Sequence, residues 1–184
     1  MARSGEELTG PLGERLIFRK TTRDTGGKLL EVEAVYLAHS DPPPEHLHAY
    51  QEERFHVVAG EIQVSIDGRE SVYESGQDFV VPVGARHWMQ NISNTEGRVI
   101  WQTRPALKTE RFFETMWGLA RDGKTNPKGV PNLLQVAVIF REYDREFRLA
   151  KPSRLIQQMV FGLLAPLGRA LGYRPAYPKY SKTE

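Results

Sequence analysis

Four potential metal ligands in the first half of the chain restrict its fold more than any other feature. His46 and His48 are two residues apart, so on a β-strand both imidazoles point to the same face. Glu53 follows five residues after His48, and it joins that face only if the chain bends at residues 49–51. His87 comes much later, after a Pro-Val-Gly turn. Three imidazoles and one carboxylate suit a divalent transition metal.

The residues that follow alternate as in a β-strand. Glu53 shares one face with Phe55 and Val57, whereas His56 lies on the opposite face. Further short alternating segments follow, and Asp67-Gly68 between two of them is a strong hairpin signal. Many short strands separated by Gly and Pro predict an all-β barrel or sandwich.

Two blocks of this region resemble the two sequence motifs of the cupin superfamily. The first motif is HxH, four residues, Glu, six residues and Gly, and the second is Gly, five residues, PxG, two residues, His, three residues and Asn. The Gly that usually precedes the first motif is replaced by Ser40. The resemblance covers roughly residues 28–105 and implies a mainly β fold, a single antiparallel double-stranded β-helix (cupin or jelly-roll barrel) with a metal pocket inside. The matching positions are His46, His48, Glu53, Gly60, Gly76, Pro82, Gly84, His87 and Asn91.

The metal and the function are expected from these residues and from the resemblance together. We expect one divalent transition metal (Fe, Mn, Ni, Cu or Zn), bound by His46, His48, Glu53 and His87. The chain has no Cys and no GxSxG block, so its chemistry should be centred on the metal, with Glu53 and Tyr36 as candidate catalytic proton carriers. We expect an enzyme that acts on a small organic molecule. An oxygenase similar to quercetin-dioxygenase-like cupins is favoured over an isomerase or cyclase, and a non-enzymatic small-molecule-binding or sensing cupin is the alternative.

Several other polar residues are interpreted as structural. His39 and His56 are expected to serve packing or an interface, and Asn91 is expected to serve the fold. Trp101 and Gln102 are neighbours on the last predicted strand, so one of them must face inward. The sequence does not decide which.

Beyond the predicted barrel the pattern becomes helical. Residues 110–119 and 154–171 carry large apolar side chains at i, i+1, i+4 and i+5, which predicts two helices with buried apolar faces. Pro166 is expected to kink or divide the second helix. Residues 132–148 are also expected to be helical, but the β-branched content of residues 135–140 leaves a strand open there.

These patterns predict a flexible N-terminus over residues 1–14, a barrel over 15–105 and a helical extension with a tail over 106–184. We expect the extension to pack on the barrel or on the second subunit of a homodimer. Residues 141–184 hold nine Lys/Arg and four Asp/Glu, so contact with an anionic membrane is the less favoured alternative. The net charge of +2 gives no reason to expect nucleic acid. An N-terminus without an apolar leader predicts a cytoplasmic protein.

Overall fold

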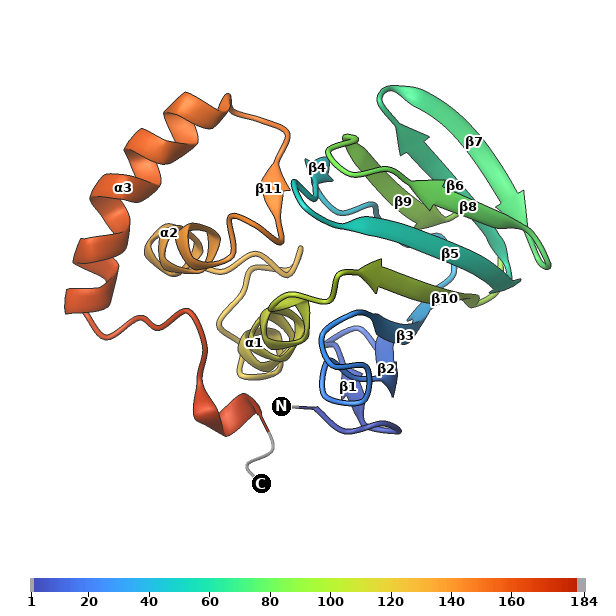
Figure 1. Cartoon of the computed structure of the whole chain (residues 1–184), viewed down its shortest axis with the longest axis horizontal. Helices are drawn as coiled ribbons and strands as arrows, with labels where there is room; N and C mark the ends of the chain where they lie inside the picture. The colour runs from blue at the N-terminus through green and yellow to red at the C-terminus, as the bar shows by residue number, and fades with distance from the viewer. Residues whose placement is uncertain (1, 182–184) are drawn as a thin grey trace.

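The computed structural model describes residues 2–181 and contains two β-sheets followed by three α-helices (Figure 1). The strands are β1 (Glu7–Thr9), β2 (Arg15–Lys20), β3 (Leu30–Tyr36), β4 (His46–Leu47), β5 (Glu52–Ala59), β6 (Glu61–Ile66), β7 (Arg69–Glu74), β8 (Asp78–Val81), β9 (His87–Asn91), β10 (Gly97–Arg104) and β11 (Arg148–Leu149). The helices are α1 (Thr109–Arg121), α2 (Leu133–Glu142) and α3 (Arg154–Ala170), and a 3-10 turn, η1, follows at Pro178–Tyr180.

The strands pair antiparallel throughout the two sheets. One sheet has six strands in the order β1-β2-β3-β10-β5-β8, and the other has five in the order β11-β4-β9-β6-β7. The predicted fold class, an antiparallel double-stranded β-helix with a C-terminal helical extension, is confirmed. The extension also returns to the barrel, because β11 pairs with β4 and adds an edge strand to the second sheet.

Local sequence rules explain the strands around the site. In β5, Phe55 and Val57 are buried while His56 is exposed, as the alternation predicts. Between β6 and β7, Asp67 and Gly68 both have positive φ, 49° and 80°, which is the backbone of the two-residue hairpin turn that Asp-Gly favours.

The N-terminal segment contains a short strand. Residues 7–9 lie in the part predicted to be flexible, but they form β1 against β2, with Leu8 opposite Leu16. Ala2 and Leu8 are both buried in the main core, so two apolar side chains anchor a segment that is otherwise polar and glycine-rich. Residues 7–9 therefore belong to the first sheet, and the flexibility of residues 1–14 stays a prediction.

Helix α1 closes one side of the barrel core. Phe112 and Phe113 are buried, and Met116 and Trp117 pack half-buried against the same core, which confirms the predicted burial of this stripe. The ring of Phe113 lies 5.0 Å from that of Trp101 in β10.

Residues 133–142 form helix α2, so the strand alternative for residues 135–140 is wrong. The Asn132 side chain caps the helix by accepting a hydrogen bond from the Gln135 backbone N–H at 3.0 Å. The helix is shorter than predicted, because it ends at Glu142 and the chain then enters a turn before β11.

Helix α3 is continuous through Pro166, so the proline does not divide it. Its apolar stripe faces solvent, since Leu155, Met159 and Leu163 are 67%, 61% and 76% exposed. The barrel of the same chain therefore does not cover this stripe, and packing on a partner subunit, the other predicted alternative, stays a prediction. Among residues 2–181, no helix is long and apolar enough to cross a membrane.

On the outer face of β3, Glu33 is bound by two arginines. Arg98 donates from Nε to Glu33 Oε1 at 3.0 Å, and Arg19 donates from Nη1 to Oε2 at 3.1 Å. The hydrogen bond from Arg98 lowers the pKa of Glu33, and it outweighs the opposing effect of burial. A carboxylate with a lowered folded-state pKa stabilises the fold above its unfolded-state pKa, and this contribution is lost as pH falls through the folded-state value.

We therefore expect Glu33→Gln to lower the free energy of unfolding by about 1 kcal/mol at neutral pH. The difference from the unmodified protein should stay constant from about pH 7 to about pH 5 and shrink as the pH falls further to about 3. Urea denaturation of both proteins across this pH range measures the difference in their free energies of unfolding. A difference that stays constant over the range would contradict the assignment.

Candidate metal centre

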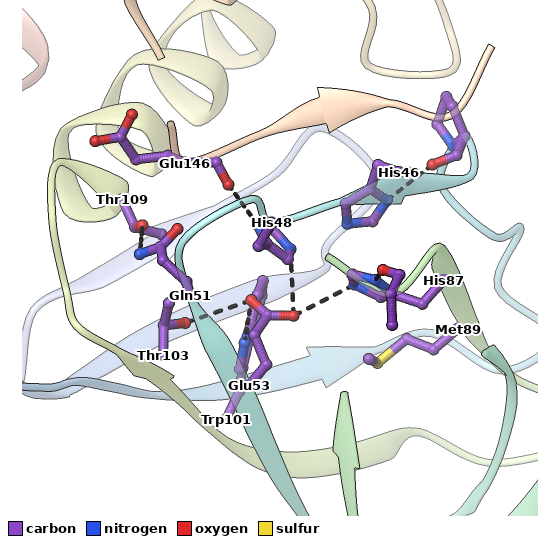
Figure 2. Close-up of polar contacts among 12 residues, drawn as sticks. His46, His48, Gln51, Glu53, His87, Met89, Trp101, Thr103, Thr109 and Glu146 are labelled. Atoms are coloured by element: carbon purple, nitrogen blue, oxygen red, sulfur yellow. Dashed lines mark hydrogen bonds and ion pairs between the residues drawn. The ribbon is translucent and has the colours of Figure 1, made fainter. Parts of the chain in front are cut away.

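Three buried histidines converge inside the barrel (Figure 2). His46 lies in β4, His48 follows just after it, and His87 begins β9, directly opposite His46 in the strand pairing. One ring nitrogen from each lies within 4.8 Å of the other two. This is the spacing expected of ligands that share one metal ion.

Hydrogen bonds fix the orientation of each ring. In every case Nδ1 contacts a backbone carbonyl, and a carbonyl can only accept, so each Nδ1 carries the proton. Each Nε2 then keeps its lone pair free, which is the state that metal-binding histidines adopt. The three pairs are His46 with Pro44 at 2.9 Å, His87 with Ala85 at 3.2 Å, and His48 with Glu146.

Glu53 in β5 lies beneath the imidazoles. Its Oε2 is 3.3 Å from Nε2 of both His48 and His87. Its other oxygen, Oε1, accepts hydrogen bonds from Trp101 Nε1 at 2.9 Å and Thr103 Oγ1 at 3.4 Å (Figure 2). The carboxylate is thereby held by one oxygen while the second is directed at the histidines.

Burial and charge perturb the titration of these groups. Burial raises the pKa of Glu53, but the facing His48 and His87 outweigh it and hold that pKa well below its usual range. Burial lowers the pKa of His48, and the negative charge of Glu53 together with the Glu146 carbonyl reverses this into a net rise. The pKa of His46 is lowered by burial and by the two neighbouring imidazoles, so His46 is neutral. An ionised carboxylate beside a neutral imidazole is the charge state that a divalent cation requires.

The donor set fits a divalent transition metal. Glu53 Oε2 and His48 Nε2 are buried, and neither makes a hydrogen bond. Buried polar atoms without partners are costly, and a cation between them would satisfy both. Imidazole nitrogens and a carboxylate oxygen suit Fe, Mn, Ni, Cu and Zn alike, so the site does not select one metal.

Tyr36, the second predicted catalytic residue, lies at the end of β3. Its hydroxyl donates to Met89 Sδ at 3.4 Å. Burial and the negative charge of Glu53 raise the pKa of Tyr36 well above its ordinary value. Tyr36 is therefore protonated at neutral pH and can only donate its proton; its catalytic role stays a prediction.

The strand β10 resolves the choice between Trp101 and Gln102. Trp101 faces inward, because its indole N–H contacts Glu53, and Gln102 faces outward, where its amide donates to Glu31 at 2.7 Å.

The polar residues that were interpreted as structural all make contacts outside the metal centre. His56 is exposed and pairs with Asp78 Oδ1 at 2.9 Å, and His39 is exposed and contacts Asn94 at 2.8 Å. The Asn91 side chain ties the end of β9 to two backbone carbonyls, at 2.9 and 2.7 Å.

The C-terminal extension supplies part of the site, which the sequence analysis missed. The carbonyl of Glu146 orients His48, and the ring of Phe147 stacks on His46 with centroids 4.5 Å apart. The pairing of Leu149 in β11 with His46 in β4 holds this segment in place. A backbone carbonyl and a packing ring carry no motif, so no sequence signal indicated them.

A cavity of about 460 Å³ opens between β6 and β7. None of the three histidines lines it, but Ile66, one of its residues, is directly opposite His87 in the strand pairing. Directly paired residues point to the same face of a sheet, so the cavity lies over β6 and β7 on the face to which His87 of the neighbouring β9 points. Its lining residues are Val64, Ile66, Asp67, Arg69, Ser71 and Tyr73.

Comparison with known proteins agrees with this architecture. Residues 34–103 match the sequence model of the cupin domain family. Over 61 residues the chain is 33% identical to the polyketide synthase CurC of Streptomyces cyaneus, covering 33% of this chain and 40% of that protein. Over 154 residues it is 26% identical to an oxidoreductase of Arthrobotrys oligospora, covering 76% of this chain and 59% of that protein. The chain thus spans less than two thirds of the length of these two relatives.

Among solved structures, an RmlC-like cupin from Shewanella frigidimarina is 22% identical, with a TM-score of 0.49, and the match covers 60% of this chain and 92% of that one. The part of the chain that matches the cupin domain family, residues 34–103, contributes strands to both antiparallel sheets, as the two sequence motifs predicted. Its buried histidines form a candidate metal site.

Proposed function

We propose that this protein is a metal-dependent enzyme that acts on a small organic molecule. The observation that carries the proposal is the arrangement of His46, His48 and His87, whose Nδ1 atoms are all bonded to backbone carbonyls and whose Nε2 atoms converge. Ordinary packing would not require three buried rings to share one lone-pair direction. The same site holds one divalent transition metal.

Glu53 is the fourth ligand in this proposal. The hydrogen bonds from Trp101 and Thr103 leave only Oε2 free to bind a cation. Four protein ligands leave coordination positions for a substrate, and the bound ion would supply Lewis-acid or redox chemistry there. Tyr36 keeps its proton and would be the proton donor, whereas Glu53 would hold the ion and could accept a proton through Oε2.

We favour oxygenase chemistry similar to that of quercetin-dioxygenase-like cupins. Distant relatives are named as oxidoreductases and as polyketide synthase proteins, and polyketides are rich in phenolic and enolic groups. Such a group can bind a metal through oxygen. The cavity over β6 and β7, with Arg69, Ser71 and Tyr73 in its wall, is the proposed substrate pocket. Isomerase or cyclase chemistry is the second candidate, because the polyketide synthase relatives do not bear oxidoreductase names.

Oxygen uptake tests the proposal. Protein loaded in turn with Fe, Mn, Ni, Cu or Zn is mixed with a panel of phenolic and enolic polyketides, and dioxygen consumption and product masses are recorded. We expect uptake with at least one redox-active metal and none with Zn, because zinc has no redox chemistry. His87→Ala loaded in the same way is the control and should be inactive.

Two other results would redirect the proposal. Turnover with Zn under anaerobic conditions would replace the oxygenase by an isomerase or cyclase. The protein could also bind a compound saturably while no metal form turns the compound over. That result would favour the alternative, a non-enzymatic small-molecule-binding or sensing cupin.

A further inference from the structure

Among the elements that the structure describes, α3 carries the most exposed large apolar side chains. Figure 1 shows α3 at the edge of the molecule, on the side of α2 that faces away from the barrel. We call this surface the outer face of α3. It consists of Leu155, Ile156, Met159, Val160, Leu163 and Leu167, and Leu171 continues it just beyond the helix; all seven are exposed.

The outer face is unusually wide. At 100° per residue its side chains span an arc of about 160° around the helix axis. No polar or charged residue falls inside that arc, since Gln157, Gln158, Arg154 and Arg169 all lie outside it. A helix that pairs with one other helix needs only a narrow seam, whereas a helix lying on a membrane surface presents a broad apolar face.

The opposite face of α3 locks the helix onto α2, so the outer face cannot turn inward. A Cβ placed on Gly168 would lie 2.8 Å from Val138 Cγ2, so the absence of a side chain there allows the close contact. Ala165 is buried in the same contact, and the rings of Phe161 and Phe140 meet at 5.9 Å.

The segment of the chain that carries the outer face has charges of one sign only. Residues 147–181 contain six Lys/Arg and no Asp/Glu. Arg154 and Arg169, at the two ends of the helix, reach acidic side chains only outside this segment, at 3.7 and 3.5 Å. Lys151 and Arg174 just beyond the two ends are exposed and form no ion pair with any described residue. Basic groups at both ends of an apolar face complement a negatively charged surface.

We propose that the outer face of α3 docks the protein on the surface of an anionic membrane, with the helix lying in the plane of the interface. The apolar side chains enter the acyl boundary, and Lys151 and Arg174 contact lipid phosphates. A second copy of the chain is the poorer occupant, because a two-fold contact places the same basic helix ends against each other and α3 has no acidic side chain to compensate.

Vesicle flotation with the full-length protein tests this proposal and requires neither metal nor substrate. We expect the protein to float with phosphatidylcholine vesicles containing phosphatidylglycerol, and to float more weakly with phosphatidylcholine alone. Met159→Glu combined with Leu163→Glu should lower the partition coefficient by about 100-fold, because each large apolar side chain contributes about tenfold. Lys151→Glu combined with Arg174→Glu should remove the preference for anionic vesicles, which added salt should also weaken.

Leu12→Glu and Val72→Glu are the matched controls, because Leu12 and Val72 are also exposed but lie on the barrel side of the molecule. They should float like the unmodified protein, and thermal unfolding should be the same for every variant. Two results would overturn the proposal. The unmodified protein could fail to float with either vesicle. Light scattering could instead show a dimer that Met159→Glu with Leu163→Glu converts to monomers, which would make a second copy the occupant.

Discussion

Replacing either His48 or His87 with Ala should abolish stoichiometric metal binding while the barrel stays folded. Each imidazole contributes one of the converging Nε2 atoms, and neither Glu53 nor a neighbouring histidine can replace it without breaking its own hydrogen bonds. Loss of a residue that merely supports a ligand lowers metal affinity about 10–100-fold, so loss of a ligand itself should exceed about 100-fold. Elemental analysis after dialysis against a weak chelator measures the metal retained by each variant.

His56→Ala is the matched control for this experiment. His56 lies three residues from Glu53 on the same strand, but its ring is exposed and bonded to Asp78. It should retain one metal per chain. Circular dichroism establishes that all three variants are folded, and full metal occupancy in both His48→Ala and His87→Ala would end the assignment.

Gly60→Ala should be among the most destabilising single-methyl changes in the barrel. Gly60 joins β5 to β6 with φ at 85°, a conformation that costs other residues about 1–2 kcal/mol. A Cβ there would also lie 2.8 Å from the Cα of Gly97, and backbone cannot rotate away as a side chain can. Overpacking of this kind costs about 1–3 kcal/mol, so the expected loss in the free energy of unfolding is about 2–5 kcal/mol.

Gly68→Ala separates the two effects. Gly68 has a similar φ of 80° in the β6–β7 hairpin, but no atom lies within 4 Å of the Cβ that would be added. It should lose only the backbone cost of about 1–2 kcal/mol. Equal losses for Gly60→Ala and Gly68→Ala in urea denaturation would show that the contact with Gly97 has no energetic effect.

The convergence of the three histidines could be predicted because its signals are local in sequence. Spacing and strand alternation are enough to place His46, His48 and Glu53 on one side of a bent chain, and a fixed turn precedes His87. The sequence could not decide whether Trp101 or its neighbour Gln102 faces inward, because alternation defines two faces of a strand without saying which one is inside. The β10–β5 register then places Trp101 directly opposite Phe55, on the inner face.

Contacts between distant segments could not be predicted. The carbonyl of Glu146 is 98 residues from His48 in sequence, and every residue type has such a carbonyl. The apolar spacing of α3 correctly predicted a helix but not its environment. Spacing shows that an apolar stripe exists but not what covers it. The contact with α2 is made by Gly168 and Ala165, and these residues are too small to stand out in a hydrophobic pattern.

Crystals of the metal-loaded protein provide the most direct test of the metal centre. Anomalous diffraction at the absorption edge of the loaded metal locates the ion without reference to activity. We predict one peak per chain, about 2.0–2.2 Å from Nε2 of His46, His48 and His87 and from Oε2 of Glu53. An ion bound only elsewhere on the chain, or no peak between these residues in fully loaded protein, would contradict the account.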